Sequence, residues 1–132
     1  RQMCIRDRYV TKKMMRRKSG SIVNITSTAG LLADAGTLAY GGSKSALGHA
    51  SRVLATELGP LGIRVNAVAP SAVVSGMADQ MDETARARLS DREALAGETL
   101  PSDVAEIVSY LLSDSAAAIS GQVIRVDRAM PF

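Results

Sequence analysis

Cysteine, histidine and long apolar runs are nearly or wholly missing from this sequence, and each absence excludes a class of protein. The 132 residues include one cysteine, Cys4, and one histidine, His49, so we expect neither an internal disulfide nor a metal site. No apolar run reaches the roughly 18 residues that a membrane-spanning helix needs. The start also lacks an apolar segment with a small-residue cleavage site, so we expect no secretory signal and a cytoplasmic location.

Acidic side chains are scarce in the first eighteen residues, where Asp7 alone accompanies eight lysines and arginines. The rest of the chain is slightly acidic, so the net charge of +3 hides a strongly basic start. A basic cluster can bind nucleic acid or an acidic membrane surface. Here only Tyr9 is available to stack on bases, and Met14 and Met15 indicate the apolar side of a helix. We therefore expect a solvated helix end, with no nucleic-acid partner and no membrane partner.

Apolar periodicity divides the remainder into alternating helices and strands. The composition, 46% hydrophobic and 22% charged, is typical of one modest globular domain. Short β-branched runs predict buried strands, and apolar residues three or four apart predict helices. We expect, in chain order, a helix ending at Arg17, a strand at 21–25, a helix from about Tyr40 to Leu58, a strand at 63–69, a helix at 101–112 and a strand at 122–126. This alternation predicts an α/β fold with a parallel sheet covered by helices.

Two of these helices and one loop carry more specific expectations. The helix through Tyr40 has apolar residues at steps of three and four, which predict one buried face made of Leu47, Ala50, Leu54 and Leu58. The later helix should bury its own apolar set, which consists of Val104, Ile107, Val108, Leu111 and Leu112. The connection from Ser71 to Gly97 includes a helix-prone stretch at 82–92, and its length is typical of a lid or binding loop.

The most informative pair of residues is Tyr40 and Lys44. Residues four apart on a helix lie one above the other on the same face. A free phenol is almost fully protonated at neutral pH and is a poor base, but a cation held close to it favours the phenolate. The pair is therefore a candidate for acid–base catalysis. Taken alone, such a pair is more often a surface pair that stabilises the helix by a few tenths of a kcal/mol.

The topology brings further polar residues to the same place. Ser27 follows the first expected strand, Pro70 and Ser71 follow the second, and Tyr40 opens the helix between them. In open parallel sheets ligands bind beyond the carboxyl ends of the strands. We therefore expect these residues to share one edge of the sheet.

With these positions located, the chain resembles the C-terminal half of a short-chain dehydrogenase/reductase. The segment 22–30 resembles that family's strand with its catalytic serine, and Tyr40-Gly41-Gly42-Ser43-Lys44 matches its Tyr-x-x-x-Lys helix. Residues 65–71 resemble its Asn-x-x-x-Pro-Gly strand end, and 101–105 and 120–127 resemble its last helix and last strand. The resemblance implies a Rossmann-like, doubly wound fold. Within the family the chain is similar to 3-oxoacyl-carrier-protein reductases and to sugar or polyol dehydrogenases.

The resemblance implies a role for each matching residue. Tyr40 is expected to be the general acid or base, Lys44 to support it and to bind the nicotinamide ribose, and Ser27 to hold the substrate carbonyl oxygen. The cofactor, NAD or NADP, is expected to contact Tyr40, Lys44, Pro70, Ser71, Val73 and Ser75. The implied reaction is hydride transfer between nicotinamide and a small carbonyl compound or secondary alcohol. Members of the family are often homotetramers, so a homo-oligomer is expected.

Several positions depart from the family pattern. Ser71 replaces the usual glycine after Pro70, and Arg128 and Ala129 replace a usual pair of glycines after Asp127. Ser75 stands where the family usually has threonine. His49 takes a helix position that is often glycine, and we interpret it as a packing or interface residue.

The glycine-rich phosphate loop of the family has no counterpart, since no G-x-G-x-x-G occurs in the sequence. We therefore expect residues 10–132 to be the catalytic, C-terminal half of one Rossmann-like domain, and residues 1–9 to be a non-native or disordered start. The alternative is a catalytically incompetent fragment, or an interaction module, that cannot bind cofactor alone. Such a piece would expose a sheet edge and apolar helix faces.

Overall fold

The computed structural model describes residues 2–74 and 83–131, with the side chains of residues 2–9, 83, 85 and 86 left outside the description. Its helices are α1 (Gln2–Arg17), α2 (Leu38–Leu58), α3 (Glu83–Ser90) and α4 (Pro101–Leu112). Its strands are β1 (Gly20–Ile25), β2 (Ile63–Pro70) and β3 (Val123–Val126). Short 3-10 turns form η1 (Thr28–Gly30), η2 (Gly59–Leu61) and η4 (Asp114–Ala116).

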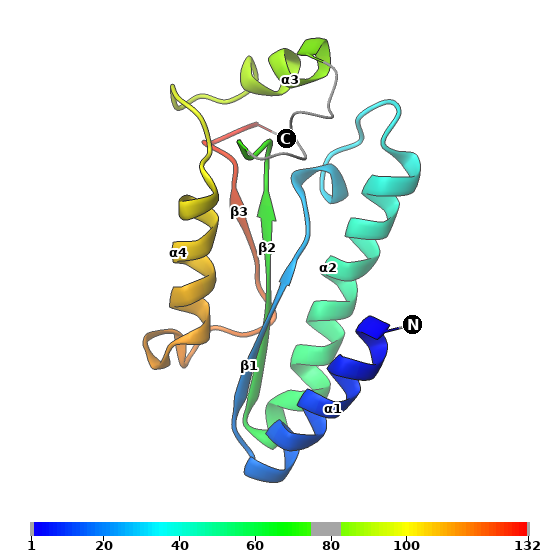
Figure 1. Ribbon diagram of the computed structural model, residues 1–132, viewed down its shortest axis with the longest axis vertical. Helices are drawn as coiled ribbons and strands as arrows, with labels where there is room; N and C mark the ends of the chain where they lie inside the picture. The colour runs from blue at the N-terminus through cyan, green and yellow to red at the C-terminus, as the bar shows by residue number, and fades with distance from the viewer. Residues whose placement is uncertain (1, 75–82, 132) are drawn as a thin grey trace.

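The three strands form one parallel sheet with helices on both sides (Figure 1). The order is β1-β2-β3, with Gly20 opposite Ile63 at one end and Pro70 opposite Val126 at the other. Helices α1 and α2 cover one face, and α4 covers the other (Figure 1). The predicted α/β class and parallel sheet are confirmed.

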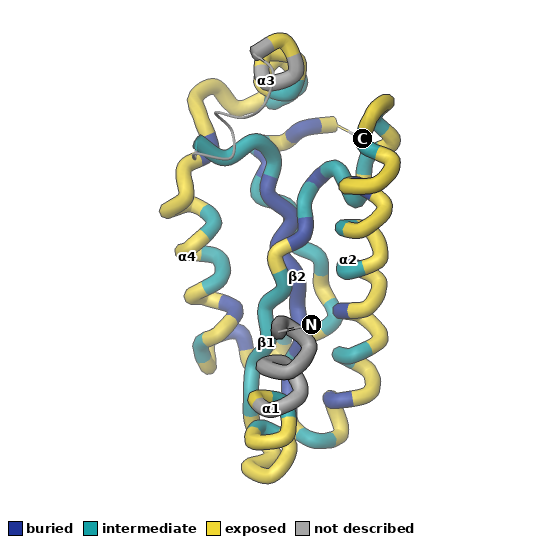
Figure 2. The backbone as a smooth tube through the Cα atoms, turned by 45° about the vertical axis from the view of Figure 1, so that its right-hand side comes forward, coloured by how far each residue is buried: buried dark blue, intermediate teal, exposed yellow. Residues whose placement is uncertain are grey.

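The middle strand β2 forms the core, because helices cover both of its faces. Val65, Ala67, Val68 and Ala69 are fully buried (Figure 2). Toward α2, Ile63 and Val65 pack with Leu58. Toward α4, a second cluster consists of Val68, Leu111 and Ala116. Residues 67–70 form the continuous apolar run that burial on both faces favours. The buried Asn66 is compensated, because its Nδ2 donates to Ile119 O and its Oδ1 accepts from Gln122 N–H.

The predicted buried faces are right in part. Leu58 and Leu111 are buried, but Ala50 is exposed, and its neighbour Ser51 is fully buried in its place. The Ser51 hydroxyl donates to Leu47 O at 2.8 Å and accepts from Asn24 Nδ2 at 2.9 Å, so the burial of this polar group is compensated. Leu112 is 50% exposed because it lies at the last position of α4, one step around the helix from Leu111.

The remaining boundaries agree closely with the expected ones. Helix α1 ends at Arg17 as predicted, and it begins at Gln2, so it includes residues expected to form a disordered start. Whether residues 1–9 are native stays a prediction. Helix α3 lies within the helix-prone stretch of the long loop. Among the described residues, no helix is long and apolar enough to cross a membrane.

A close backbone contact joins the turn after β1 to the start of α2. An added Cβ at Gly41 would lie 2.4 Å from Ala29 O, and one at Gly30 would lie 2.7 Å from Ser45 N. Real Cβ atoms do not approach other atoms so closely, so only glycine allows η1 and α2 to touch here. This contact sets the distance between the residues that follow β1 and those that open α2.

The adjacent glycines of α2 provide a test of that contact. Gly41→Ala should lower the free energy of unfolding by about 1–3 kcal/mol, as overpacking does, because the methyl group must displace the Ala29 carbonyl. Gly42→Ala is the matched control, since an added Cβ there meets nothing within 4 Å. Gly42→Ala should instead raise the free energy of unfolding by roughly 0.5–1 kcal/mol, because alanine favours the helix more than glycine does. Urea unfolding of both variants measures the difference, and equal effects would contradict the contact.

Candidate functional site

The carboxyl ends of β1 and β2 lie side by side and form the base of the candidate site. After β1 ends at Ile25, Thr26 donates from both its backbone N–H and its hydroxyl to Val68 O, at 2.7 and 2.9 Å. These two bonds hold the chain against β2 for one residue longer. Ser27 therefore leaves the sheet from a fixed point.

Ser27 then caps the turn η1. Its backbone is extended, with φ −164° and ψ 154°, and its Oγ accepts from Ala29 N–H at 3.2 Å. A hydroxyl has one O–H donor and two lone pairs, so this single contact leaves the donor for another group. The structure places Ser27 at the expected edge of the sheet.

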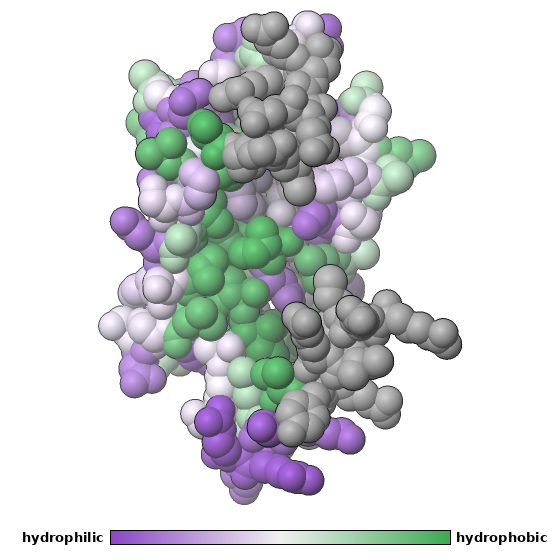
Figure 3. All heavy atoms as spheres, in the orientation of Figure 1, coloured by the Kyte–Doolittle hydropathy of each residue, from purple (hydrophilic) through white to green (hydrophobic). Residues whose placement is uncertain are grey.

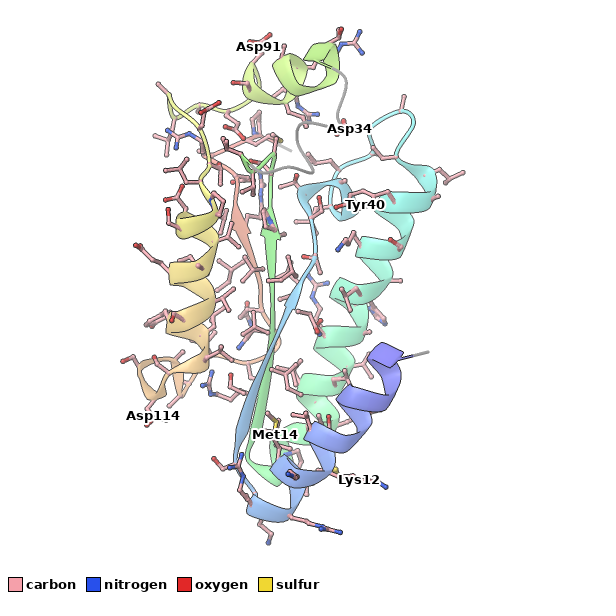
Figure 4. The ribbon with its side chains drawn as sticks, in the orientation of Figure 1. Lys12, Met14, Asp34, Tyr40, Asp91 and Asp114 are labelled. Carbon is pink, nitrogen blue, oxygen red and sulfur yellow. The ribbon has the colours of Figure 1, made fainter. Side chains whose placement is uncertain are left out.

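Tyr40 and Lys44 lie one above the other at the start of α2, as their spacing predicts. The Tyr40 side chain is about half exposed, and Lys44 Nζ lies 5.7 Å from its ring centroid, within the range of a cation–π contact. Lys44 Nζ also donates to Ile25 O at 3.0 Å. That bond ties the helix to the carboxyl end of β1, and Figure 4 shows Tyr40 at this end of the molecule.

The end of β2 supplies the next predicted residues. Ser71 N–H donates to Val126 O at 3.0 Å, and its hydroxyl donates to Glu93 Oε1 at 2.5 Å. Val73 forms an isolated parallel bridge with Thr99. Pro70 is buried as the last residue of β2. Ser75 lies outside the described residues, so its expected contact with the cofactor stays a prediction.

Other residues at this edge are not evident from sequence motifs. Arg92 forms an ion pair with Asp34, 2.8 Å from Nη1 to Oδ1, which joins the loop after β2 to the loop before α2. Glu93 and Arg128 form a second pair, with 3.8 Å between Oε2 and Nε. The sequence shows only that the residues of these two ion pairs are charged and lie in loops. No spacing rule predicts a pairing between residues so far apart in the chain. His49 is exposed on α2.

The donor groups at this edge fit a cofactor that carries ribose hydroxyls. An ammonium group has three N–H donors, so the bond from Lys44 to Ile25 O leaves donors for such hydroxyls. The phenol of Tyr40 is accessible and can exchange a proton with a ligand beside it. In the described part of the chain, no group of three or more His, Cys, Asp or Glu residues could hold a metal ion.

Comparisons with known proteins show which family the chain matches. A family model described as Enoyl-(Acyl carrier protein) reductase matches residues 7–130. The 3-oxoacyl-[acyl-carrier-protein] reductase FabG of Rickettsia felis is 38% identical over 126 residues, which are 96% of this chain and 52% of that protein. A probable short-chain type dehydrogenase/reductase of Bradyrhizobium diazoefficiens is also 38% identical, over 93% of this chain and 44% of that protein.

Solved structures show the same fold. A 3-oxoacyl-[acyl-carrier protein] reductase from Brucella melitensis superposes with a TM-score of 0.84 and 30% identity, over 93% of this chain and 46% of the other. A 7 alpha-hydroxysteroid dehydrogenase, solved with NADH and 7-oxo glycochenodeoxycholic acid, superposes with a TM-score of 0.84 and 28% identity. The match covers 89% of this chain and 46% of the other. The chain thus spans about half the length of the relatives it matches. Because the family match extends over nearly all of its residues and the fold agrees, the chain belongs to the short-chain dehydrogenase/reductase family.

Proposed function

We propose that this chain forms the catalytic part of an NAD(P)-dependent oxidoreductase, which transfers a hydride between nicotinamide and a small carbonyl compound or secondary alcohol. The observation that carries the proposal is the placement of Tyr40 and Lys44 at the carboxyl edge of the sheet, with Lys44 fixed to Ile25 O. The family membership supports the general reaction.

In this proposal Tyr40 moves the proton. During reduction its hydroxyl donates a proton to the carbonyl oxygen as the hydride reaches the carbonyl carbon. During oxidation the phenolate accepts the proton of the alcohol. The ammonium of Lys44, beside the ring, stabilises the negative charge that develops on the phenol oxygen. Ser27 donates its free O–H to the same substrate oxygen and so fixes the orientation of the carbonyl.

The cofactor would be held by residues along the same edge. We propose that Lys44 and Tyr40 bind the nicotinamide ribose, and that Pro70, Ser71, Val73 and Ser75 line the nicotinamide pocket. The bound nicotinamide supplies the hydride chemistry, while the protein supplies position and electrostatics. The substrates named for relatives suggest an acyl thioester or another small carbonyl compound. A homo-oligomer in the cytoplasm is part of the same proposal.

Replacing the acid tests the role of Tyr40. The assay needs a protein that contains this chain together with a cofactor-binding half like that of its relatives, called here the full-length protein. In it, Tyr40→Phe should lower carbonyl-dependent NADH or NADPH oxidation by about 10²–10⁴-fold, the usual contribution of a positioned acid or base. Cofactor binding should be retained, because Lys44 and the other proposed pocket residues are unchanged. Tyr110→Phe is a matched control, because Tyr110 lies on α4 and is similarly exposed. Turnover of the Tyr40 variant near that of the control would reject the proposed acid.

A second candidate function is that the 132 residues alone form an interaction module without activity. Strand β1 lies at one edge of the described sheet, and its last residue, Ile25, is 44% exposed. Figure 3 shows apolar side chains gathered over this face of the molecule between α4 and α2. An exposed edge and apolar surface of this kind favour association with further protein.

Cofactor titration separates the two functions. The isolated 132-residue chain contains no G-x-G-x-x-G turn to bind the pyrophosphate, so we expect no saturable binding of NAD(H) or NADP(H) at micromolar concentrations. Isothermal titration calorimetry measures this, and sedimentation of the same sample measures its association. Micromolar affinity would overturn the interaction-module alternative.

A further inference from the structure

Two positions that depart from the family pattern meet at one carboxylate. Ser71 Oγ donates to Glu93 Oε1 at 2.5 Å, and Arg128 Nε lies 3.8 Å from Glu93 Oε2. Ser71 follows β2 and Arg128 follows β3, so Glu93 lies between the ends of two neighbouring strands. The Glu93 side chain is only 7% exposed.

Arg128 is enclosed by the segment that follows Glu93. Its Nε donates to Leu95 O at 2.8 Å, its Nη1 donates to Glu98 O at 3.4 Å, and its own carbonyl accepts from Leu95 N–H at 3.0 Å. An added Cβ at Gly97 would lie 2.9 Å from Arg128 Nη2. The segment therefore wraps around the guanidinium, and Gly97, with φ 110°, leaves the room for it.

Both ends of this segment are fastened to other parts of the site. Arg92 pairs with Asp34, which precedes the Tyr40 helix. Thr99 pairs with Val73, and Thr99 O accepts from Val74 N–H at 3.0 Å. Residues 92–99, which we call the strap, thus extend from the Tyr40 side of the site to the ends of β2 and β3.

The buried carboxylate is the strongest of these anchors. The Arg92–Asp34 pair is about one-third exposed on each side, and exposed ion pairs contribute little. A buried carboxylate, in contrast, is costly unless it is paired and hydrogen-bonded. The Ser71 hydroxyl and the Arg128 guanidinium meet that requirement, and hydrogen bonds to charged groups are stronger than neutral ones. Because Glu93 belongs to the strap, moving the strap would separate this carboxylate from Ser71 and Arg128.

We infer that Glu93 is a positioning residue for the nicotinamide pocket: it fixes Ser71 at the end of β2 and holds the strap across the carboxyl edge of the sheet. The inference rests on the proposed function, which places Pro70 and Ser71 in that pocket. Glu93 acts through Ser71 and Arg128 and exchanges no proton with the substrate. Its loss should weaken cofactor binding and leave the chemical step nearly unchanged.

Hydrogen exchange of the 132-residue chain tests the strap without any need for activity. In Glu93→Ala, the amides of Leu95 and Val74 should exchange about tenfold faster or more, the effect of losing one charge-assisted hydrogen bond. In Glu93→Gln the exchange rates should lie between those of the unchanged protein and Glu93→Ala. The glutamine amide oxygen still accepts from Ser71, but the side chain carries no charge to attract Arg128. Glu106→Ala, which removes an exposed glutamate from α4, is the control. Unchanged exchange at Leu95 and Val74 in Glu93→Ala would overturn the inference.

Kinetics of the full-length protein test the functional half. Glu93→Ala should raise the KM for the nicotinamide cofactor several-fold and keep kcat within about twofold, the pattern of a lost binding interaction. Ser71→Ala removes only the hydroxyl and should raise the KM for the cofactor similarly. This variant replaces Glu93→Ala in the test if Glu93→Ala does not fold. If Tyr40→Phe abolishes turnover while these variants keep the original KM, the inference fails and the proposed function stands. If Tyr40→Phe stays active, the proposed function fails, and the exchange result still decides the strap.

Discussion

The close approach of two backbones, at Gly30 and Gly41, sets the geometry of the whole candidate site. Ser27 belongs to the turn on one side of this contact, and Tyr40 and Lys44 belong to the helix on the other. A side chain at either glycine would push the turn and the helix apart. Lys44 adds a bond across the same junction, because its ammonium donates to the last carbonyl of β1. The hydroxyl of Ser27 and the phenol of Tyr40 are therefore positioned by backbone packing, before any ligand is present.

The sheet extends this constraint to the other side of the site. Because β2 is buried on both faces, its end at Pro70 is fixed relative to β1. The two hydrogen bonds that Thr26 donates to Val68 O keep the two strand ends together. The third strand ends alongside, with Ser71 bound to Val126 O. Residues from three separate segments of the chain thus face one edge, as is usual for ligand sites in open parallel sheets.

The sequence predicted the fold well because local patterns determine it. Short β-branched runs, helical apolar spacing and glycine or proline boundaries placed every described strand and most helix ends, and the Tyr40–Lys44 spacing placed both on one face. Periodicity failed where a buried position is polar: Ser51 takes the place expected for Ala50 because Asn24, on a strand, accommodates its hydroxyl. The contacts of Glu93 were not predictable either, since they join residues 22 and 35 positions apart through the fold.

The enclosure of Arg128 has a consequence for how related sequences vary. A side chain at position 97 would have to displace the end of the Arg128 guanidinium, and position 97 also needs a backbone conformation that glycine adopts most readily. Arg128 itself has a left-handed backbone, with φ 52°, at a position where the family usually has glycine. A substitution at position 97 should therefore be disfavoured mainly by its backbone, whatever residue stands at 128, and it would also shift the guanidinium out of its place in the strap.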